Sequence, residues 1–143
     1  MGQLTNILHY HTYYIDTHIN MLCAVVRGES MNENIVSSDL IRGNIDAIIL
    51  CVLLEGDSYG YEIIKTIFSK SGGIYELKEP SLYTSLKRLE GQGLVEAYWG
   101  DESQGGRRKY YKITSPGKAV YAQSLAAWKT ARDVIDRLIE RKE

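Results

Sequence analysis

Two neighbouring stretches of the chain carry side chains whose chemistry suits a polyanion. The first stretch contains hydroxyl groups and cations at Ser81, Tyr83, Thr84, Lys87 and Arg88. The second stretch, Gln104-Gly105-Gly106-Arg107-Arg108, combines glycines with two guanidinium groups. Such groups hydrogen-bond to phosphates and base edges, and arginine also suits a narrow minor groove. Residues 78–118 hold eight Lys/Arg against five Asp/Glu, a net charge of +3 in a chain whose net charge is −1. We therefore expect a polyanion to bind there.

An amphipathic helix is expected to position the first stretch. Pro80 suits the first turn of a helix, where its missing amide hydrogen would have no partner, and Gly91 and Gly93 end the helix after about Glu90. One face carries the leucines Leu82, Leu86 and Leu89. The spacing predicts that the opposite face carries Ser81, Thr84, Ser85 and Arg88, with Tyr83 and Lys87 on a flank. The leucine face would pack on a core and leave the polar face to a partner.

A β-hairpin is expected to position the second stretch. Two β-prone runs, 94–99 and 107–114, flank a polar, glycine-containing tip. A cationic hairpin directly after a helix of this kind is the arrangement of a wing. The DNA major groove is about 12 Å wide and admits one helix. The hairpin arginines would then reach the neighbouring phosphates or the minor groove.

Two earlier helices complete the predicted domain. The first is capped by Ser37-Ser38-Asp39 and ends near Glu55-Gly56, and the second runs over residues 59–70. The first has apolar residues at Ile41, Ile45, Ile48, Ile49, Val52 and Leu53, and the second at Tyr61, Ile64, Ile67 and Phe68. Residues 74–77 fit either a short strand or a loop. The order helix, helix, helix, hairpin predicts a mainly α fold with a β-hairpin, a winged helix-turn-helix DNA-binding domain over residues 37–114.

Residues 115–143 predict a long C-terminal helix that begins at Ser115 as N-cap and Pro116 in the first turn. Its apolar stripe consists of Tyr121, Leu125, Trp128, Ala131, Ile135, Leu138 and Ile139, and all but Ile139 are expected at the dimer interface. A helix of this length extends roughly 40 Å, more than the small preceding domain can cover. We therefore expect a second copy of the chain to cover it as a dimerisation helix. Two copies would place two reading helices about 34 Å apart, as a palindromic DNA site requires.

Trp128 lies near the middle of this stripe. One interpretation is an anchor of the dimer interface. The alternative is that two Trp128 side chains line a cavity between the protomers, where their indole faces would stack on a planar aromatic or cationic molecule.

The first residues of the chain differ from the rest. All three histidines precede Met31, and the segment before Met31 has one arginine and no lysine. It lacks the basic start of a signal peptide. We expect residues 1–36 to be an N-terminal extension, and the alternative is that native translation starts at Met31. His9-Tyr10-His11 has no neighbouring ligands that would complete a metal site.

Several function classes are not expected. No histidine follows Met31, and no serine or cysteine has an evident general base, which argues against an enzyme. Neighbouring carboxylates at Asp101 and Glu102 are typical of a solvated loop rather than a metal site, and no cofactor is indicated. Two cysteines, Cys23 and Cys51, do not form a disulfide framework and favour the reducing cytoplasm. No apolar run reaches the ~18 residues of a membrane span.

Residues 40–143 resemble the PadR family of bacterial transcriptional regulators, in its short-chain branch. The resemblance is carried by Arg42-Gly43, Glu55-Gly56, residues 59–63, Ser81-Leu82-Tyr83, residues 86–90, Gly93-Leu94, residues 105–111, Ile113-Thr114 and Gly117. Residues 98–104 and Trp128 resemble the multidrug-binding members. Asp57-Ser58 and Thr84 stand where prolines are common in the family, and Arg132 stands where an acid would favour cationic drugs.

The resemblance implies a homodimer with double-stranded DNA as its partner. Such a protein is usually a repressor, and a planar aromatic or drug-like effector releases it from the operator. An alternative is a winged-helix module for protein–protein contact without ligand sensing. The two differ at the wing, because a protein-contact module would tolerate the loss of the wing's positive charge.

Overall fold

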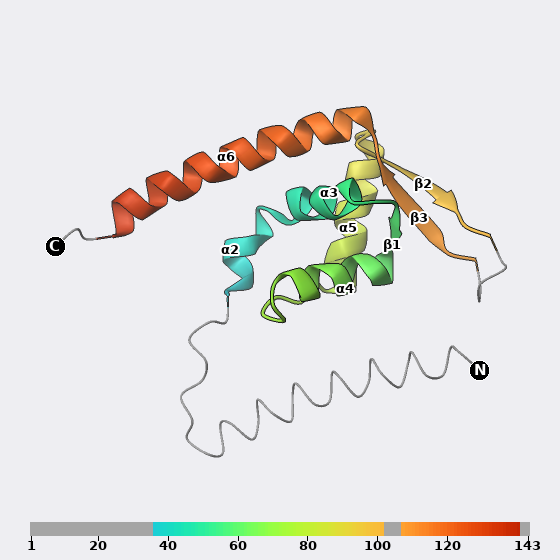
Figure 1. Ribbon diagram of the computed structural model, residues 1–143, viewed down its shortest axis with the longest axis horizontal. Helices are drawn as coiled ribbons and strands as arrows, with labels where there is room; N and C mark the ends of the chain where they lie inside the picture. Colours follow the sequence, from blue (N-terminus) through green and yellow to red (C-terminus); the bar gives the residue numbers. More distant parts are fainter. Residues whose placement is uncertain (1–35, 102–106, 141–143) are drawn as a thin grey trace, which may run out of the picture. The chain divides into compact units, whose positions relative to one another are not determined.

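The computed structural model describes residues 36–101 and 107–140 (Figure 1). Its elements are α2 (Ser38–Arg42), α3 (Ile45–Leu54), β1 (Ser58–Tyr59), α4 (Gly60–Lys70), α5 (Glu79–Gly91), β2 (Val95–Trp99), β3 (Lys109–Ile113) and α6 (Ser115–Ile139). The expected extension before Val36 and the wing-tip residues Gln104, Gly105 and Gly106 lie outside the described residues. The predicted winged-helix order of three helices, a hairpin and a long helix is confirmed.

Helices α3, α4 and α5 pack together around an apolar core. The core residues of α3 are Ile49, Leu50, Val52 and Leu53, those of α4 are Ile63, Ile64 and Ile67, and those of α5 are Leu82, Leu86 and Leu89. Each α5 leucine is at most 1% exposed, as its predicted apolar face requires. Burial of such side chains contributes about 1.5–3 kcal/mol each. The leucines therefore hold α5 against the domain and leave its other face free.

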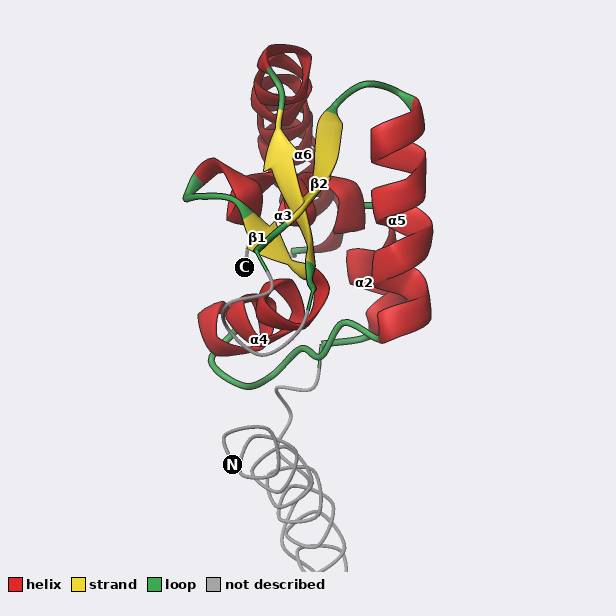
Figure 2. Ribbon diagram, turned by 90° about the vertical axis from the view of Figure 1, so that its right-hand side faces the viewer, coloured by secondary structure: helices red, strands yellow, loops and turns green. Residues whose placement is uncertain are grey.

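The sheet has three antiparallel strands in the order β1-β3-β2 (Figure 2). Val95 and Ile113 are cross-strand partners, and both side chains are buried in the core. The next pair, Glu96 and Lys112, is exposed, so the two faces of the hairpin alternate as in any half-buried sheet. Strand β3 packs on α3, and β2 packs on α5. The hairpin is therefore tied to the helix that precedes it.

The first two predicted helices differ in detail from the structure. The first is split, because Gly43 ends α2 and Asn44 is the N-cap of α3. Tyr61 was expected in the core, but its side chain is 37% exposed, whereas Ile63 is fully buried. At about 100° per residue, Ile63, Ile64 and Ile67 share an inward arc that Tyr61 lies outside. Residues 74–77 form a loop rather than a strand.

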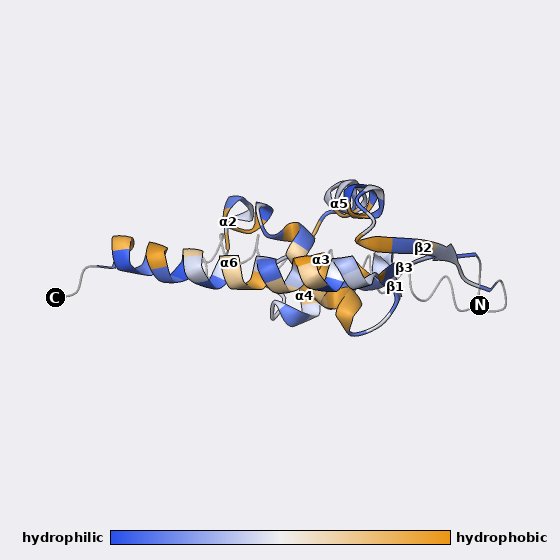
Figure 3. Cartoon of the chain, turned by 90° about the horizontal axis from the view of Figure 1, so that it is seen from above, coloured by the Kyte–Doolittle hydropathy of each residue, from blue (hydrophilic) through white to orange (hydrophobic). Residues whose placement is uncertain are grey.

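Helix α6 begins one residue earlier than its predicted cap implies. Thr114, not Ser115, is the N-cap, and its Oγ1 accepts a hydrogen bond from the Gly117 amide at 3.1 Å. The same hydroxyl donates to the Gly93 carbonyl at 2.7 Å, which ties α6 to the turn after α5. The helix packs on α3 near its start and then continues past the domain, with apolar residues recurring to its end (Figures 1 and 3).

Candidate nucleic-acid interface

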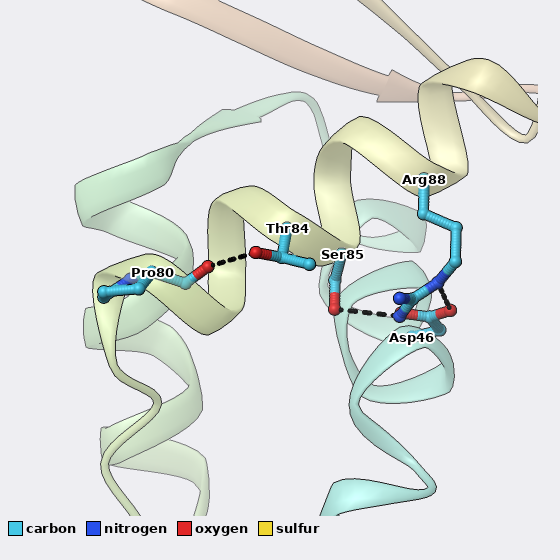
Figure 4. Close-up of polar contacts among 5 residues, drawn as sticks. All are labelled: Asp46, Pro80, Thr84, Ser85 and Arg88. Atoms are coloured by element: carbon cyan, nitrogen blue, oxygen red, sulfur yellow. Dashed lines mark hydrogen bonds and ion pairs between the residues drawn. The ribbon is translucent and has the colours of Figure 1, made fainter.

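The outward face of α5 is polar and accessible. Ser81, Thr84 and Lys87 are all exposed. Thr84 donates its hydroxyl hydrogen to the Pro80 carbonyl one turn earlier at 2.7 Å, which leaves its oxygen able to accept (Figure 4). Pro80 occupies the first turn, as its missing amide hydrogen allows. This face offers hydroxyls and one ammonium group at the positions that the sequence predicts.

Ser85 does not belong to that face. Its side chain is only 4% exposed, although it was expected beside Ser81 and Thr84. Ser85 lies about 60° around the helix from Leu82, so it borders the leucine face and is covered by the packing of α5 on the domain. Its oxygen accepts a hydrogen bond from Arg88 Nη2 at 3.2 Å.

Arg88 is half-exposed and bound to another helix. Its Nε donates to Asp46 Oδ2 at 2.9 Å, and its Nη2 donates to Asp46 Oδ1 at 2.6 Å (Figure 4). This double hydrogen bond to a carboxylate raises the pKa of Arg88 above its ordinary value. Asp46 belongs to the first turn of α3. The structure thus gives this predicted DNA-binding residue a partner within the protein.

Tyr83 leans toward the start of α4. Its side chain is 49% exposed, and its hydroxyl lies where a side chain on Gly60 would be, 2.5 Å from an ideal Cβ position. Only glycine at residue 60 leaves this space open. Tyr83 therefore lies at the border of the exposed α5 face, next to α4, in keeping with its predicted place on a flank.

The wing presents a row of tyrosines beside a cation. Tyr98 stacks on Tyr110 with ring centroids 5.6 Å apart, and Tyr110 meets Tyr59 edge to face at 5.5 Å. The guanidinium carbon of Arg108 lies 4.7 Å from the Tyr59 ring centroid. Tyr98 donates its hydroxyl hydrogen to Asp57 at 2.7 Å, and this bond raises the pKa of Tyr98. The row holds Arg108 on the exposed side of the sheet.

Of the other wing residues that the sequence singled out, Arg107 is exposed and precedes β3, whereas Gln104, Gly105 and Gly106 are not described. The sequence did not indicate Asp46, Asp57, Tyr59 and Gly60 as contributors to this surface. Tyr59 and Gly60 belong to the family motif at residues 59–63, but their partners, Tyr110 and Tyr83, come from distant parts of the chain.

The apolar stripe of α6 is covered only near its start. Tyr121 and Leu125 are half-buried, whereas Trp128 is 43% exposed, Ala131 is exposed, Ile135 is 51% exposed and Leu138 is 80% exposed. Tyr121 donates to the Cys51 sulfur at 3.5 Å, which raises the pKa of Tyr121. The guanidinium carbon of Arg132 lies 5.1 Å from the Trp128 ring centroid. The C-terminal half of the helix thus carries apolar side chains that the other described residues do not bury.

Two further properties of the described residues concern metal ligands and apolar helices. Across residues 36–101 and 107–140, no three His, Cys, Asp or Glu side chains are grouped closely enough to hold a metal ion. In the same part of the chain, no helix has both the length and the apolar character needed to cross a bilayer.

Comparison with known proteins identifies the family. Residues 49–123 match the transcriptional regulator PadR-like family. A transcriptional regulator from Clostridium thermocellum is 45% identical, with a TM-score of 0.69, over 73% of this chain and 99% of its own. A PadR family regulator from Clostridium difficile is 36% identical, with a TM-score of 0.62, over 68% of this chain and all of its own. An uncharacterized protein of Lysinibacillus sphaericus is 45% identical over 108 residues, 76% of this chain and 99% of its own.

The match covers more than half of the chain, and it includes α5, the hairpin and the start of α6. The alignments to the two solved structures cover nearly all of those chains. This chain therefore shares the fold of the complete relatives and not of a fragment of them. The chain therefore belongs to the PadR-like family of transcriptional regulators.

Proposed function

We propose that this DNA-binding transcriptional regulator is a homodimeric repressor of a roughly palindromic operator. In this proposal residues 37–114 bind the DNA, residues 115–143 form the dimer, and a planar aromatic molecule at the dimer interface releases the complex. Membership of the PadR-like family supports DNA-binding regulation and not catalysis. A chromosomal operator would place the protein in the cytoplasm.

The observation that carries the proposal is the division of α5 into two faces. Three leucines on one face are at most 1% exposed, whereas Ser81, Thr84 and Lys87 on the other face are exposed. A helix held in this way can enter the major groove with its hydroxyls and ammonium group toward the base edges and phosphates. Arg108 on the adjacent hairpin adds a cation that can bind the flanking backbone.

The dimer is supported by the uncovered half of α6. Large apolar side chains recur on one side of the helix through Trp128, Ile135 and Leu138. An exposed contiguous apolar surface of this kind is typical of an interaction site. A second copy fits best, because a symmetric dimer pairs identical surfaces and doubles the DNA-reading helices.

The effector site is supported by the half-exposed indole of Trp128. Arg132 lies over this ring and also contacts the Asp133 carboxylate at 3.1 Å, so its charge is partly offset. Because the guanidinium group already lies over the ring, neutral planar aromatics suit the site better than cationic drugs do. We expect Trp128→Ala to keep the fold but to lose both the binding of such a molecule and the ligand-induced release of DNA. Unchanged ligand affinity of the variant, measured by calorimetry, would contradict this site.

Fluorescence anisotropy tests the DNA-binding proposal. The full chain is titrated into a labelled duplex from upstream of its own gene and, in parallel, into a scrambled duplex at the same salt concentration. We expect binding of the upstream duplex to be at least about 10³-fold tighter. Sedimentation velocity should show a dimer, and the complex should contain two chains. Equal affinity for both duplexes would contradict operator recognition, and no binding to either would favour the protein-contact alternative.

A further inference from the structure

Arg88 and Asp46 link the DNA-reading helix to the first helix of the core. Arg88 lies in the last turn of α5, and Asp46 lies in the first turn of α3, 42 residues earlier in the chain. Two hydrogen bonds of 2.9 and 2.6 Å join them side by side (Figure 4). The Ser85 hydroxyl, buried between the helices, accepts a third bond from the same guanidinium group. Three directional contacts therefore meet at one point of the α3–α5 interface.

These contacts do something that the leucines of α5 cannot do. Leucine contacts are non-directional, so they hold α5 close to the domain but resist a small rotation or slide of the helix only weakly. A guanidinium fork on a carboxylate has one preferred planar geometry, which adds a restraint on orientation. Asp46 at a helix N-terminus and Arg88 at a helix C-terminus also lie where the helix dipoles favour their charges.

The orientation of α5 decides where its outward side chains point. Exposed polar atoms lie roughly 5–6 Å from a helix axis, so a rotation of about 20° displaces them by about 2 Å. Hydrogen bonds to base edges tolerate only a few tenths of an ångström. The attraction between cations and phosphates falls only as the inverse of their separation, so it loses far less over the same displacement than a hydrogen bond does. A small rotation would thus remove sequence discrimination at Ser81, Thr84 and Lys87 and leave general DNA affinity almost intact.

We propose that Asp46 and Arg88 are a positioning pair that sets the sequence specificity of α5, and that Arg88 acts through this pair without contacting DNA. The inference rests on the proposed function, because it assumes that α5 reads the operator. The charge balance supports it: the Asp46 carboxylate offsets the guanidinium charge, so Arg88 contributes little attraction to phosphate. The opposite mechanism is one in which Arg88 leaves Asp46 and binds a phosphate.

Asp46→Asn separates the two mechanisms, because the amide keeps the shape of the side chain and removes its charge. For a positioning pair, the ratio of operator affinity to scrambled-duplex affinity should fall about five- to tenfold, the size of a typical contact coupling. The substitution removes one negative charge in either mechanism, so the specificity ratio, and not the salt dependence, separates them. If Arg88 binds phosphate, the loss of Asp46 frees it, so affinity for every duplex rises or is unchanged. That result would overturn the inference.

Arg88→Lys gives a second, independent measurement, since it keeps the positive charge but loses the fork. We expect it to reduce the specificity ratio as much as Asp46→Asn does, and the double variant to be no worse than either single variant. A lysine variant that keeps full specificity, or losses that add in the double variant, would contradict a positioning pair.

Glu55→Gln is the matched control, because Glu55 at the C-terminal end of α3 forms an ion pair with Lys70 in the last turn of α4. It removes the same charge from another exposed inter-helix ion pair. We expect Glu55→Gln to change thermal stability about as little as Asp46→Asn does and to leave the specificity ratio unchanged. The wild-type chain separates the two proposals. If it binds the operator no more tightly than the scrambled duplex, the proposed function fails. If it prefers the operator and the Asp46→Asn variant has the same preference, only the positioning pair fails.

Discussion

At the residue scale, Gly117 shows how closely backbone segments approach one another in this domain. Gly117 is buried in the first turn of α6, and a Cβ atom there would collide with the Leu94 carbonyl oxygen and lie 2.8 Å from Ile113 Cγ1. The Leu94 carbonyl also accepts a hydrogen bond from the Thr114 amide at 3.1 Å. The backbone oxygen therefore cannot move aside without disturbing the end of the hairpin.

We expect Gly117→Ala to destabilise the domain by about 1–3 kcal/mol, because the added methyl group overpacks a rigid contact. Urea denaturation followed by circular dichroism measures the change. Gly91→Ala is the matched control: residue 91 ends α5 with nothing within 4 Å of the position that a Cβ atom would take, so alanine should leave stability unchanged or raise it by about 0.5–1 kcal/mol. Equal stability of the two variants would refute the close approach.

At the element scale, the hairpin and α5 form one unit. Strand β2 packs on α5, and Lys109 at the start of β3 contacts Glu90 near the end of α5 at 3.5 Å. The tyrosine row on the other face of the sheet orients the wing cation Arg108. In the proposed DNA complex, α5 and the wing would therefore bind together, with the wing supplying charge and the helix supplying discrimination.

We expect Arg107→Ala/Arg108→Ala to weaken binding to all duplexes by a similar factor and to reduce the slope of log affinity against log salt by about two. Affinity measured at several salt concentrations gives this slope. The control variant Arg42→Ala/Lys65→Ala removes two cations from α2 and α4 and should leave the slope nearly unchanged. An unaltered slope in the wing variant would argue against contact between the wing and phosphate.

At the scale of the whole molecule, α6 has more apolar surface than residues 36–101 and the hairpin cover. Tyr121 and Leu125 are half-buried, but exposure rises along the helix to 80% at Leu138. Because the Leu138 side chain is largely exposed and has little packing among the described residues, a substitution there tests the assembly separately from the fold. In the proposed dimer, the distance between the two α5 helices would depend on α6, so assembly and operator affinity should change together.

We expect Leu138→Glu to shift the protein from dimer to monomer and to weaken operator binding at least about tenfold, since the charge would be buried in the apolar interface. Sedimentation velocity gives the mass, and circular dichroism checks that the protomer stays folded. Thr130→Glu introduces the same charge on another side of α6, away from the apolar stripe, and should remain dimeric. A dimeric Leu138→Glu variant would exclude this stripe as the interface.

The sequence by itself determined the elements whose signals are local. Leucine spacing was enough to predict the inner face of α5, proline and glycine marked its ends, and the β-prone runs predicted the hairpin. The family motifs were equally visible, because they are contiguous in the chain. These properties depend on neighbours three or four residues away, and periodicity records such neighbours directly.

Only the tertiary structure decided which distant residues meet. The angular position of Arg88 on α5 showed that it lies off the leucine face, but not that Asp46 on another helix is within reach. Strand β1 is two residues long, too short for any period, and it exists because β3 pairs with it. Periodicity tells which side chains share a face of one element. Which residues that face contacts depends on how several elements pack at once. In this protein the packing of α5 on α3 brings Arg88 to the Asp46 carboxylate.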